Sequence, residues 1–260
     1  MHVAFFVPCY VDQLKPQVGL AALEVLRSVG VEPAFPEDQT CCGQPFLTAG
    51  EQDHARDLGR HFTRVFDEFD CIVTPSGSCA ATLRGHLERF VPGSAGKRLA
   101  QNTFEFCEFL VARDLEPLPL SPFPHRVGLH ASCHALRELR LGTPSETREP
   151  PRVDPAQALL ARIPELEFVD LARRDECCGF GGLFSIEEEA VSCRMGLDRL
   201  EDHLRGGAEI LTSTDVSCLL QLEGLARKRE MPLRMMHVAE ILAASLSGSS
   251  LAGRSPDGPR

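Results

Sequence analysis

The sequence predicts an α/β protein of two pseudo-symmetric halves with mainly parallel sheets, each half carrying one Cys-Cys-Gly motif. This prediction rests on an internal repeat of three cysteine landmarks, on the apolar runs that precede them, and on the helix-like segments in between. We place the first half at residues 1–120 and the second at residues 121–244. Residues 245–260 are rich in Ser, Gly and Pro and are expected to form a disordered tail.

Eight of the eleven cysteines make up the repeat. They form two sets of four, which are Cys9, Cys41, Cys42 and Cys79, and then Cys133, Cys177, Cys178 and Cys218. The spacing is Cys-x31-Cys-Cys-x36-Cys in the first set and Cys-x43-Cys-Cys-x39-Cys in the second. The longer first interval of the second set holds a Pro-, Glu- and Arg-rich stretch at residues 143–154, which predicts a surface loop. Two copies with parallel local context indicate a repeated structural unit.

The first half reads as alternating strands and helices. An apolar run at residues 3–7 predicts a buried strand that delivers Cys9 at its carboxyl end. Pro16 suits the start of a helix and Gly30 its end, because proline fits the first helical turn and glycine the position after the last. The further elements expected in this half are a short strand at 31–35, a polar helix at 51–69 and a strand at 71–74.

The second half repeats this order. Strands are expected at residues 126–129, 167–171 and 209–212, and each leads to one cysteine landmark. In mainly parallel sheets, binding sites form where loops leave the carboxyl ends of strands. All six landmarks lie at such positions, so the cysteines are expected to be site residues.

The composition excludes several classes of partner. A net charge of −10 argues against nucleic acid and against an anionic membrane surface, because both attract basic proteins. No stretch reaches the roughly 18–20 apolar residues of a membrane span, and the N-terminus lacks a basic signal region. We therefore expect a cytoplasmic protein. In a reducing cytosol, eleven cysteines indicate metal ligation or redox chemistry rather than disulfides.

Four thiolates per half suit one iron–sulfur cluster, since thiolate is a soft ligand. Adjacent cysteines in a tight turn can reach different irons of one cluster, and Gly43 and Gly179 supply the backbone freedom of that turn. Structural zinc is an alternative, although it usually uses Cys-x2-Cys knuckles, which are absent here. A vicinal disulfide or plain buried cysteines are another. Cys71, Cys107 and Cys193 are expected to be small core residues.

Two histidines near Cys133 are the candidate catalytic residues. His130 and His134 can donate a hydrogen bond to a cluster sulfur or move a proton during turnover, and a structural role is the alternative. Hydride transfer by this chain alone is not expected, because no dinucleotide-binding glycine motif follows a strand.

The motifs resemble the cysteine-rich CCG domain family, whose members include one of the subunits of heterodisulfide reductase, the iron–sulfur subunit of glycolate oxidase and lactate utilisation proteins. The resemblance covers about residues 2–243, because the two-copy arrangement is itself the hallmark of the family. The strings that resemble the lactate utilisation branch are Cys41-Cys42-Gly43-Gln44-Pro45, Pro75-Ser76-Gly77-Ser78-Cys79, Cys177-Cys178-Gly179-Phe180-Gly181-Gly182 and Met236-His237-Val238-Ala239-Glu240.

This resemblance implies an iron–sulfur subunit of a multi-protein complex that oxidises L-lactate, a small 2-hydroxy acid, to pyruvate. It implies two partner proteins, one with ferredoxin-like clusters, and two clusters on this chain, of the [4Fe–4S] type or of a non-cubane form. A glycolate oxidase-type or heterodisulfide reductase-like subunit is a second interpretation. A non-enzymatic iron–sulfur scaffold or redox sensor is a third.

One departure from the family pattern concerns the last landmark. In the heterodisulfide reductase branch this landmark is Cys-x-x-Cys, whereas here its first position is Ser76 in one half and Asp215 in the other. Each of these side chains either supplies an oxygen ligand to a modified cluster or caps the helix that carries Cys79 or Cys218. The heterodisulfide chemistry is therefore not carried over to this chain.

Overall fold

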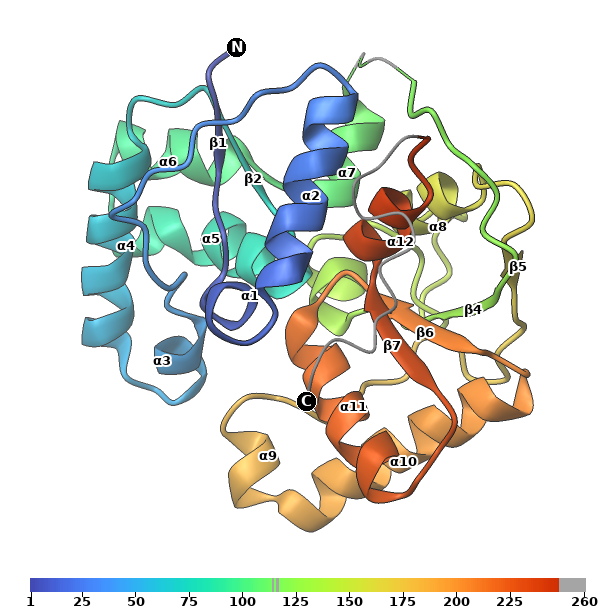
Figure 1. The fold of residues 1–260 in the computed structure, drawn as a ribbon. Coiled ribbons are helices and arrows are strands. Elements are labelled where there is room, and N and C mark those ends of the chain that lie inside the picture. The colour runs from blue at the N-terminus through green and yellow to red at the C-terminus, as the bar shows by residue number, and fades with distance from the viewer. Residues whose placement is uncertain (114, 116, 248–260) are drawn as a thin grey trace.

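The structure is a computed structural model that describes residues 1–113, 115 and 117–247 (Figure 1). The elements of the first half are β1 (Val3–Phe5), α1 (Cys9–Leu14), α2 (Pro16–Ser28), α3 (Gln44–Thr48), α4 (Gln52–Phe66), β2 (Cys71–Thr74), α5 (Gly77–Phe90), α6 (Ser94–Gln101), β3 (Thr103–Glu105) and α7 (Phe106–Ala112). Those of the second half are β4 (Arg126–Leu129), the π-helix η1 (His134–Glu138), α8 (Pro155–Leu160), β5 (Glu167–Phe168), α9 (Phe184–Glu187), α10 (Glu189–Arg205), β6 (Ile210–Ser213), α11 (Val216–Lys228), β7 (Arg234–His237) and α12 (Val238–Ala244).

Both sheets are parallel throughout, and the three strands of the first match the last three of the second in order. The first sheet runs β1-β2-β3 and the second β5-β4-β6-β7. In the first half a single parallel bridge between Ala4 and Ala34 takes the place that β5 occupies beside β4. The predicted fold class, two α/β halves with mainly parallel sheets, is therefore confirmed.

Several predicted elements have different lengths in the structure. The strand expected at 31–35 is reduced to the bridge at Ala34, and that expected at 167–171 ends at Phe168. The outer strands β3 and β7 were not predicted, because such short segments show too few alternating positions. The surface loop expected at residues 143–154 is confirmed, since it holds no helix or strand and is largely exposed.

Buried faces and caps explain the individual helices. The helix α2 begins with Pro16 in its first turn and buries Val18, Ala22, Val25 and Leu26 along one face. At the ends of β3 and β7, a buried side chain accepts backbone N–H groups of the following helix, and a glutamate three residues on completes a capping box. These caps are Glu105 with Glu108, and His237 with Glu240. The repeat thus extends to a fourth landmark that the cysteine pattern did not reveal.

The largest hydrophobic cluster extends through both halves. Side chains of β1, α2 and α7 belong to the same buried cluster as side chains of β4, α8 and α12. Figure 1 shows α2 of the first half beside α12 of the second, and these two helices pack together. The halves are therefore a repeat in sequence that shares one central cluster, while each half also has a smaller cluster of its own.

The chain remains packed for three residues past the predicted start of the tail. Ser245 and Leu246 are buried, and the Ser247 N–H donates to the Pro119 carbonyl at 2.8 Å. Residues 248–260, the rest of the predicted tail, lie outside the described residues. Among the described helices, none combines the length and the apolar character needed to cross a bilayer.

Candidate functional site

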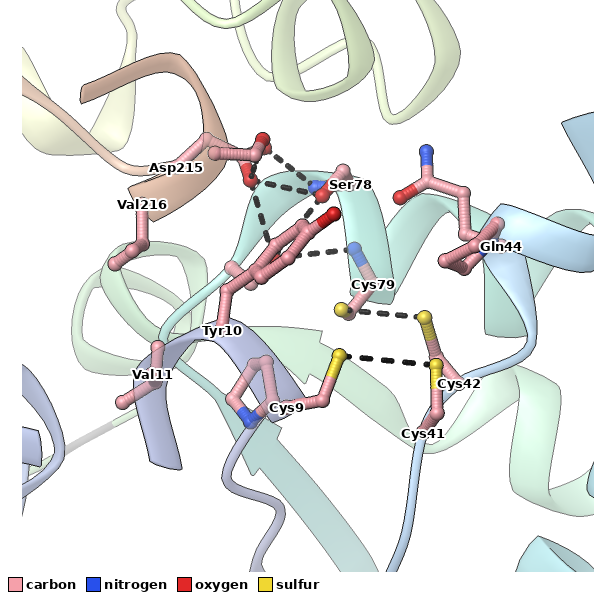
Figure 2. Close-up of a pocket in the computed structure, with 14 residues that line it drawn as sticks. Cys9, Tyr10, Val11, Cys41, Cys42, Gln44, Ser78, Cys79, Asp215 and Val216 are labelled. Carbon is pink, nitrogen blue, oxygen red and sulfur yellow. Dashed lines mark hydrogen bonds between the residues drawn. The ribbon is translucent and has the colours of Figure 1, made fainter. Parts of the chain in front are cut away.

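The four cysteines of the first half come together at the carboxyl edge of its sheet, and we call this group the first thiol site (Figure 2). Cys9 is the first residue of α1 after β1, and Cys79 lies in the first turn of α5 after β2. The loop before α3 supplies Cys41 and Cys42. The Sγ atoms of Cys9 and Cys41 are 3.8 Å apart and those of Cys42 and Cys79 are 3.2 Å apart. All four sulfur atoms face a common space in Figure 2.

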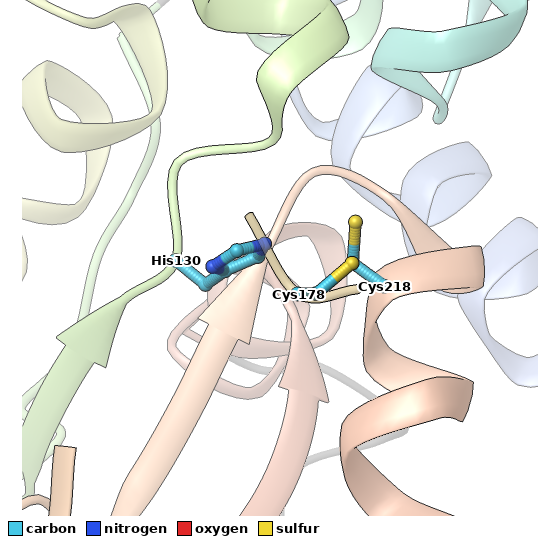
Figure 3. A group of neighbouring side chains, drawn as sticks. All are labelled: His130, Cys178 and Cys218. Atoms are coloured by element: carbon cyan, nitrogen blue, oxygen red, sulfur yellow. The ribbon is translucent and has the colours of Figure 1, made fainter. Parts of the chain in front are cut away.

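The second half gathers its four cysteines in the same way, and we call this group the second thiol site. The Cys133 thiol interacts with Cys177, and Cys178 interacts with Cys218. One further side chain joins this group (Figure 3), because ligand atoms of His130, Cys178 and Cys218 all lie within 4.8 Å of one another. None of the eleven cysteines is in a disulfide.

The three cysteines outside these sites have different surroundings. Cys71 in β2 and Cys107 in α7 are fully buried in the core, as expected. Cys193 lies in α10 and is half-buried, so the prediction that it is a core residue is wrong.

Hydrogen bonds single out the first cysteine of each adjacent pair. Side-chain interactions with the Cys42 and Cys9 thiols hold the pKa of Cys41 well below the usual range of a thiol. The Cys133 and Cys178 thiols lower the pKa of Cys177 in the same way. The N–H groups of Gly43 and Gly179 also point at these two sulfurs, at 3.4 Å each. Each site therefore favours one thiolate, the form that binds metal.

Glycine is required in both Cys-Cys-Gly turns because the backbone is left-handed there. Gly43 has φ of +90° and Gly179 has φ of +83°. A Cβ atom on Gly43 would have its nearest neighbour at 3.5 Å, whereas one on Gly179 would lie 2.4 Å from the Ser192 carbonyl oxygen.

We expect Gly43→Ala to lower the free energy of unfolding by about 1–2 kcal/mol, the cost of a left-handed alanine. Gly179→Ala should cost roughly 1–3 kcal/mol more, because the backbone near Ser192 must also move. Urea denaturation of both variants measures the difference. Equal losses would show that the close approach at Ser192 is not rigid.

Asp215 connects the two halves rather than capping its own helix. Its carboxylate is 2% exposed and makes no capping bond to α11. Instead it accepts the Ser78 N–H at 2.7 Å, at the start of α5 in the other half. It also accepts hydroxyl groups from Ser76, Ser78, Ser132 and Ser217. One carboxylate thus links the segments that carry Cys79, Cys133 and Cys218.

Ser76 is the N-cap of α5, since its Oγ accepts the Cys79 N–H at 3.2 Å. This confirms the capping interpretation for Ser76, while Asp215 is used differently. Whether either oxygen also ligates a cofactor stays a prediction. The serine partners of Asp215 were not identified from the sequence, because Ser78 and Asp215 are 137 residues apart.

The two candidate histidines lie in different surroundings. His134 is half-buried where the halves meet, with its Nε2 at 2.8 Å from Gln44 Nε2 and its Nδ1 at 3.6 Å from the Cys133 sulfur. His130 is 1% exposed, and neither ring nitrogen has a hydrogen-bond partner among the described residues. Burial, helped by the charge of Arg199, lowers the pKa of His130 to about 3, so the ring is neutral.

An aromatic contact also crosses between the halves. The Tyr10 ring, next to Cys9, packs edge-on against Phe180 of the second Cys-Cys-Gly loop, with ring centroids 5.9 Å apart. Together with the contacts of His134 and Asp215, it places both thiol sites along the boundary between the halves.

Two parallel α/β repeats, each gathering four thiols around a left-handed glycine turn, define a class of two-repeat proteins with paired thiol sites. The cysteine-rich domain family known as CCG matches residues 3–84 and 127–223, and the chain belongs to this family.

Curated relatives extend over most of the chain. It is 36% identical over 248 residues to lactate utilization protein A of an Exiguobacterium species, covering 93% of this chain and 96% of that protein. The lactate utilization protein A of Geobacillus thermodenitrificans is 38% identical over 247 residues, with 93% and 98% covered. That of Bacillus pumilus is 32% identical over 246 residues, with 93% and 99% covered.

Proposed function

We propose that this chain is an iron–sulfur, electron-transfer subunit of a cytoplasmic complex that oxidises L-lactate to pyruvate. The observation that carries the proposal is the pair of four-thiol sites, each built around a Cys-Cys-Gly turn. The names of the relatives support lactate utilisation as the process. The proposed partners are two further lactate utilisation proteins, one of them with ferredoxin-like clusters.

The donor sets fit iron–sulfur clusters by their chemistry. Each site offers four soft sulfur ligands, the number that one [4Fe–4S] cluster takes. In the first site the Asp215 carboxylate is held by serine hydroxyls and a backbone N–H, so it is already well provided with hydrogen bonds. Two conventional clusters are satisfied by these eight sulfurs and need no oxygen ligand. In a non-cubane cluster, Ser76 or Asp215 would be the oxygen ligand.

His134 is the residue we propose for proton transfer during turnover. It is partly accessible and lies where the two halves meet, next to Cys133 and Gln44. An imidazole at this place can take up the proton released when a 2-hydroxy acid is oxidised. His130 is too buried for this role.

The first experiment measures iron, acid-labile sulfide and zinc in anaerobically purified protein, together with EPR spectra of the oxidised and reduced forms. About eight iron and eight sulfide per chain are expected for two four-iron clusters. Zinc without sulfide would overturn the proposal. Lactate is then added to the protein assembled with its two partners, and the absence of cluster reduction would instead indicate a scaffold or redox sensor.

A further inference from the structure

The two thiol sites differ in the buried side chains that lie next to their cysteines. In the first half, Phe6 packs edge-on against Phe62 and Phe66 of α4, with ring centroids 5.4 Å and 5.7 Å apart. We call Phe6, Phe62 and Phe66 the aromatic triad. All three side chains are buried within the core cluster that includes Cys42 and Cys79.

The internal repeat identifies the matching positions in the second half. Val3 pairs with Cys71 in the first sheet, and Val127 pairs with Ile210 at the same point of the second. Three residues further along the chain in each half, Phe6 and His130 therefore occupy matching positions of the repeat. Along the helices, Gly59 of α4 and Gly196 of α10 each allow the next long helix to approach closely. Residues three and seven positions after these glycines are Phe62 and Phe66 in the first half, and Arg199 and His203 in the second.

The aromatic triad is thus replaced by His130, Arg199 and His203, which we call the polar triad. All three are at most 1% exposed. The Nε and Nη2 groups of Arg199 donate to His203 Nε2 at 3.2 Å and 3.0 Å. Arg199 also pairs with Asp202, which is 2% exposed, at 3.3 Å. The guanidinium is therefore held between a histidine and a carboxylate inside the protein.

A fold that accepts three phenylalanines in one half has no packing need for these groups in the other. Burying an arginine and two histidines costs free energy that the aromatic triad avoids. Buried polar atoms without a hydrogen-bond partner are rare in proteins, yet both ring nitrogens of His130 lack one in the described part of the chain. The His130 ring lies beside the sulfurs of Cys178 and Cys218 (Figure 3). The partner that fits its nitrogen is the group that those thiols hold.

We propose that His130 makes a nitrogen contact to the second iron–sulfur cluster, donating its ring N–H to a cluster sulfur, and that the polar triad gives this cluster the higher reduction potential. The proposal rests on iron–sulfur binding as proposed above. Hydrogen bonds to the sulfurs and nearby positive charge stabilise a reduced cluster, which carries more negative charge. Arg199 is a positive charge that acts on His130. His203 and Asp202 hold its guanidinium in place. Next to the first cluster these positions hold the aromatic triad, which offers no such hydrogen bond or charge, so the first cluster has the lower reduction potential.

Potentiometric titration followed by EPR tests the difference between the clusters. The native protein should show two separate reduction steps. His130→Phe introduces the side chain found at the matching place in the first half, and it should lower the higher potential while leaving the lower one unchanged. Replacing Arg199 and Asp202 together by leucine removes the charge pair without leaving one charge alone, and it should shift the same step down. His54→Phe, at an exposed position, should change neither step.

A second measurement does not depend on how the variants fold. Pulsed EPR of the reduced native protein labelled with [15N]histidine should show a histidine nitrogen coupled to one of the two clusters, with coupling weaker than for a direct iron ligand. The coupling should persist in His134→Ala, which removes the histidine beside Cys133. A single unresolved potential, an unchanged titration of His130→Phe, or no coupling to either cluster would overturn this inference while leaving iron–sulfur binding intact. Protein without iron and sulfide would overturn both.

Discussion

Replacing Cys42 with serine is expected to halve the iron and sulfide content of the anaerobically purified protein, from about eight to about four of each per chain. The Cys42 sulfur is buried and lies 3.2 Å from the Cys79 sulfur, so the substitution removes one of the four sulfur ligands from the interior of the first thiol site. Serine is a harder and more weakly acidic ligand than cysteine, and it does not replace thiolate at such a site. Cys178→Ser is the matching change in the second site and should remove the other half.

The control is Cys193→Ser, which alters a half-buried cysteine outside both sites and should leave the full metal content. The double variant of Cys42 and Cys178 should hold almost no iron. Complete loss of metal in either single variant would mean that the two sites are not independent. Full content in both single variants would show that these cysteines are not ligands.

Asp202→Ala is expected to lower the free energy of unfolding by about 3–5 kcal/mol, because it leaves the Arg199 guanidinium charged and unpaired in the interior. The same carboxylate also accepts the backbone N–H groups of Ala172 and Arg173, both at 3.1 Å. These donors lose their partner as well, which adds to the cost. Urea denaturation at neutral pH measures the change.

Asp198→Ala on the same helix is the matched comparison. Asp198 pairs with the exposed Arg194 at 2.7 Å, and a pair of this kind contributes at most about 1 kcal/mol. A similar loss in both variants would mean that the buried pair has no special cost. A loss below about 1 kcal/mol for Asp202→Ala would show that water reaches Arg199 when its partner is gone.

The sequence allowed the prediction of the features that local pattern controls. The strand at Cys71–Thr74 has the predicted bounds, because it is a continuous apolar run between polar segments. The helix starting at Pro16 follows from the proline and its apolar face. The cysteine sets were identified from their spacing and local context, and the structure brings each set together because parallel strands end at one edge of the sheet.

What could not be predicted depends on contacts distant in sequence. Ser76 and Asp215 hold the same place in the repeat, yet one caps its helix and the other binds the opposite half. The choice depends on how the halves pack, which no local pattern reveals. Arg199 and His203 were also not predicted to be buried, because their positions along the helix suggest an ordinary polar face. Only the structure shows that they lie together in the interior, near His130.

The packing of α2 against α12 also constrains how the protein is made. About 200 residues separate the end of α2 from the end of α12, so the ribosome needs on the order of 10–40 s to supply the later helix. During that interval the part of the apolar face of α2 that packs against α12 has no cover. An apolar helix face that waits for its partner is prone to contacts with other apolar surfaces, and such contacts favour aggregation or chaperone binding of the growing chain.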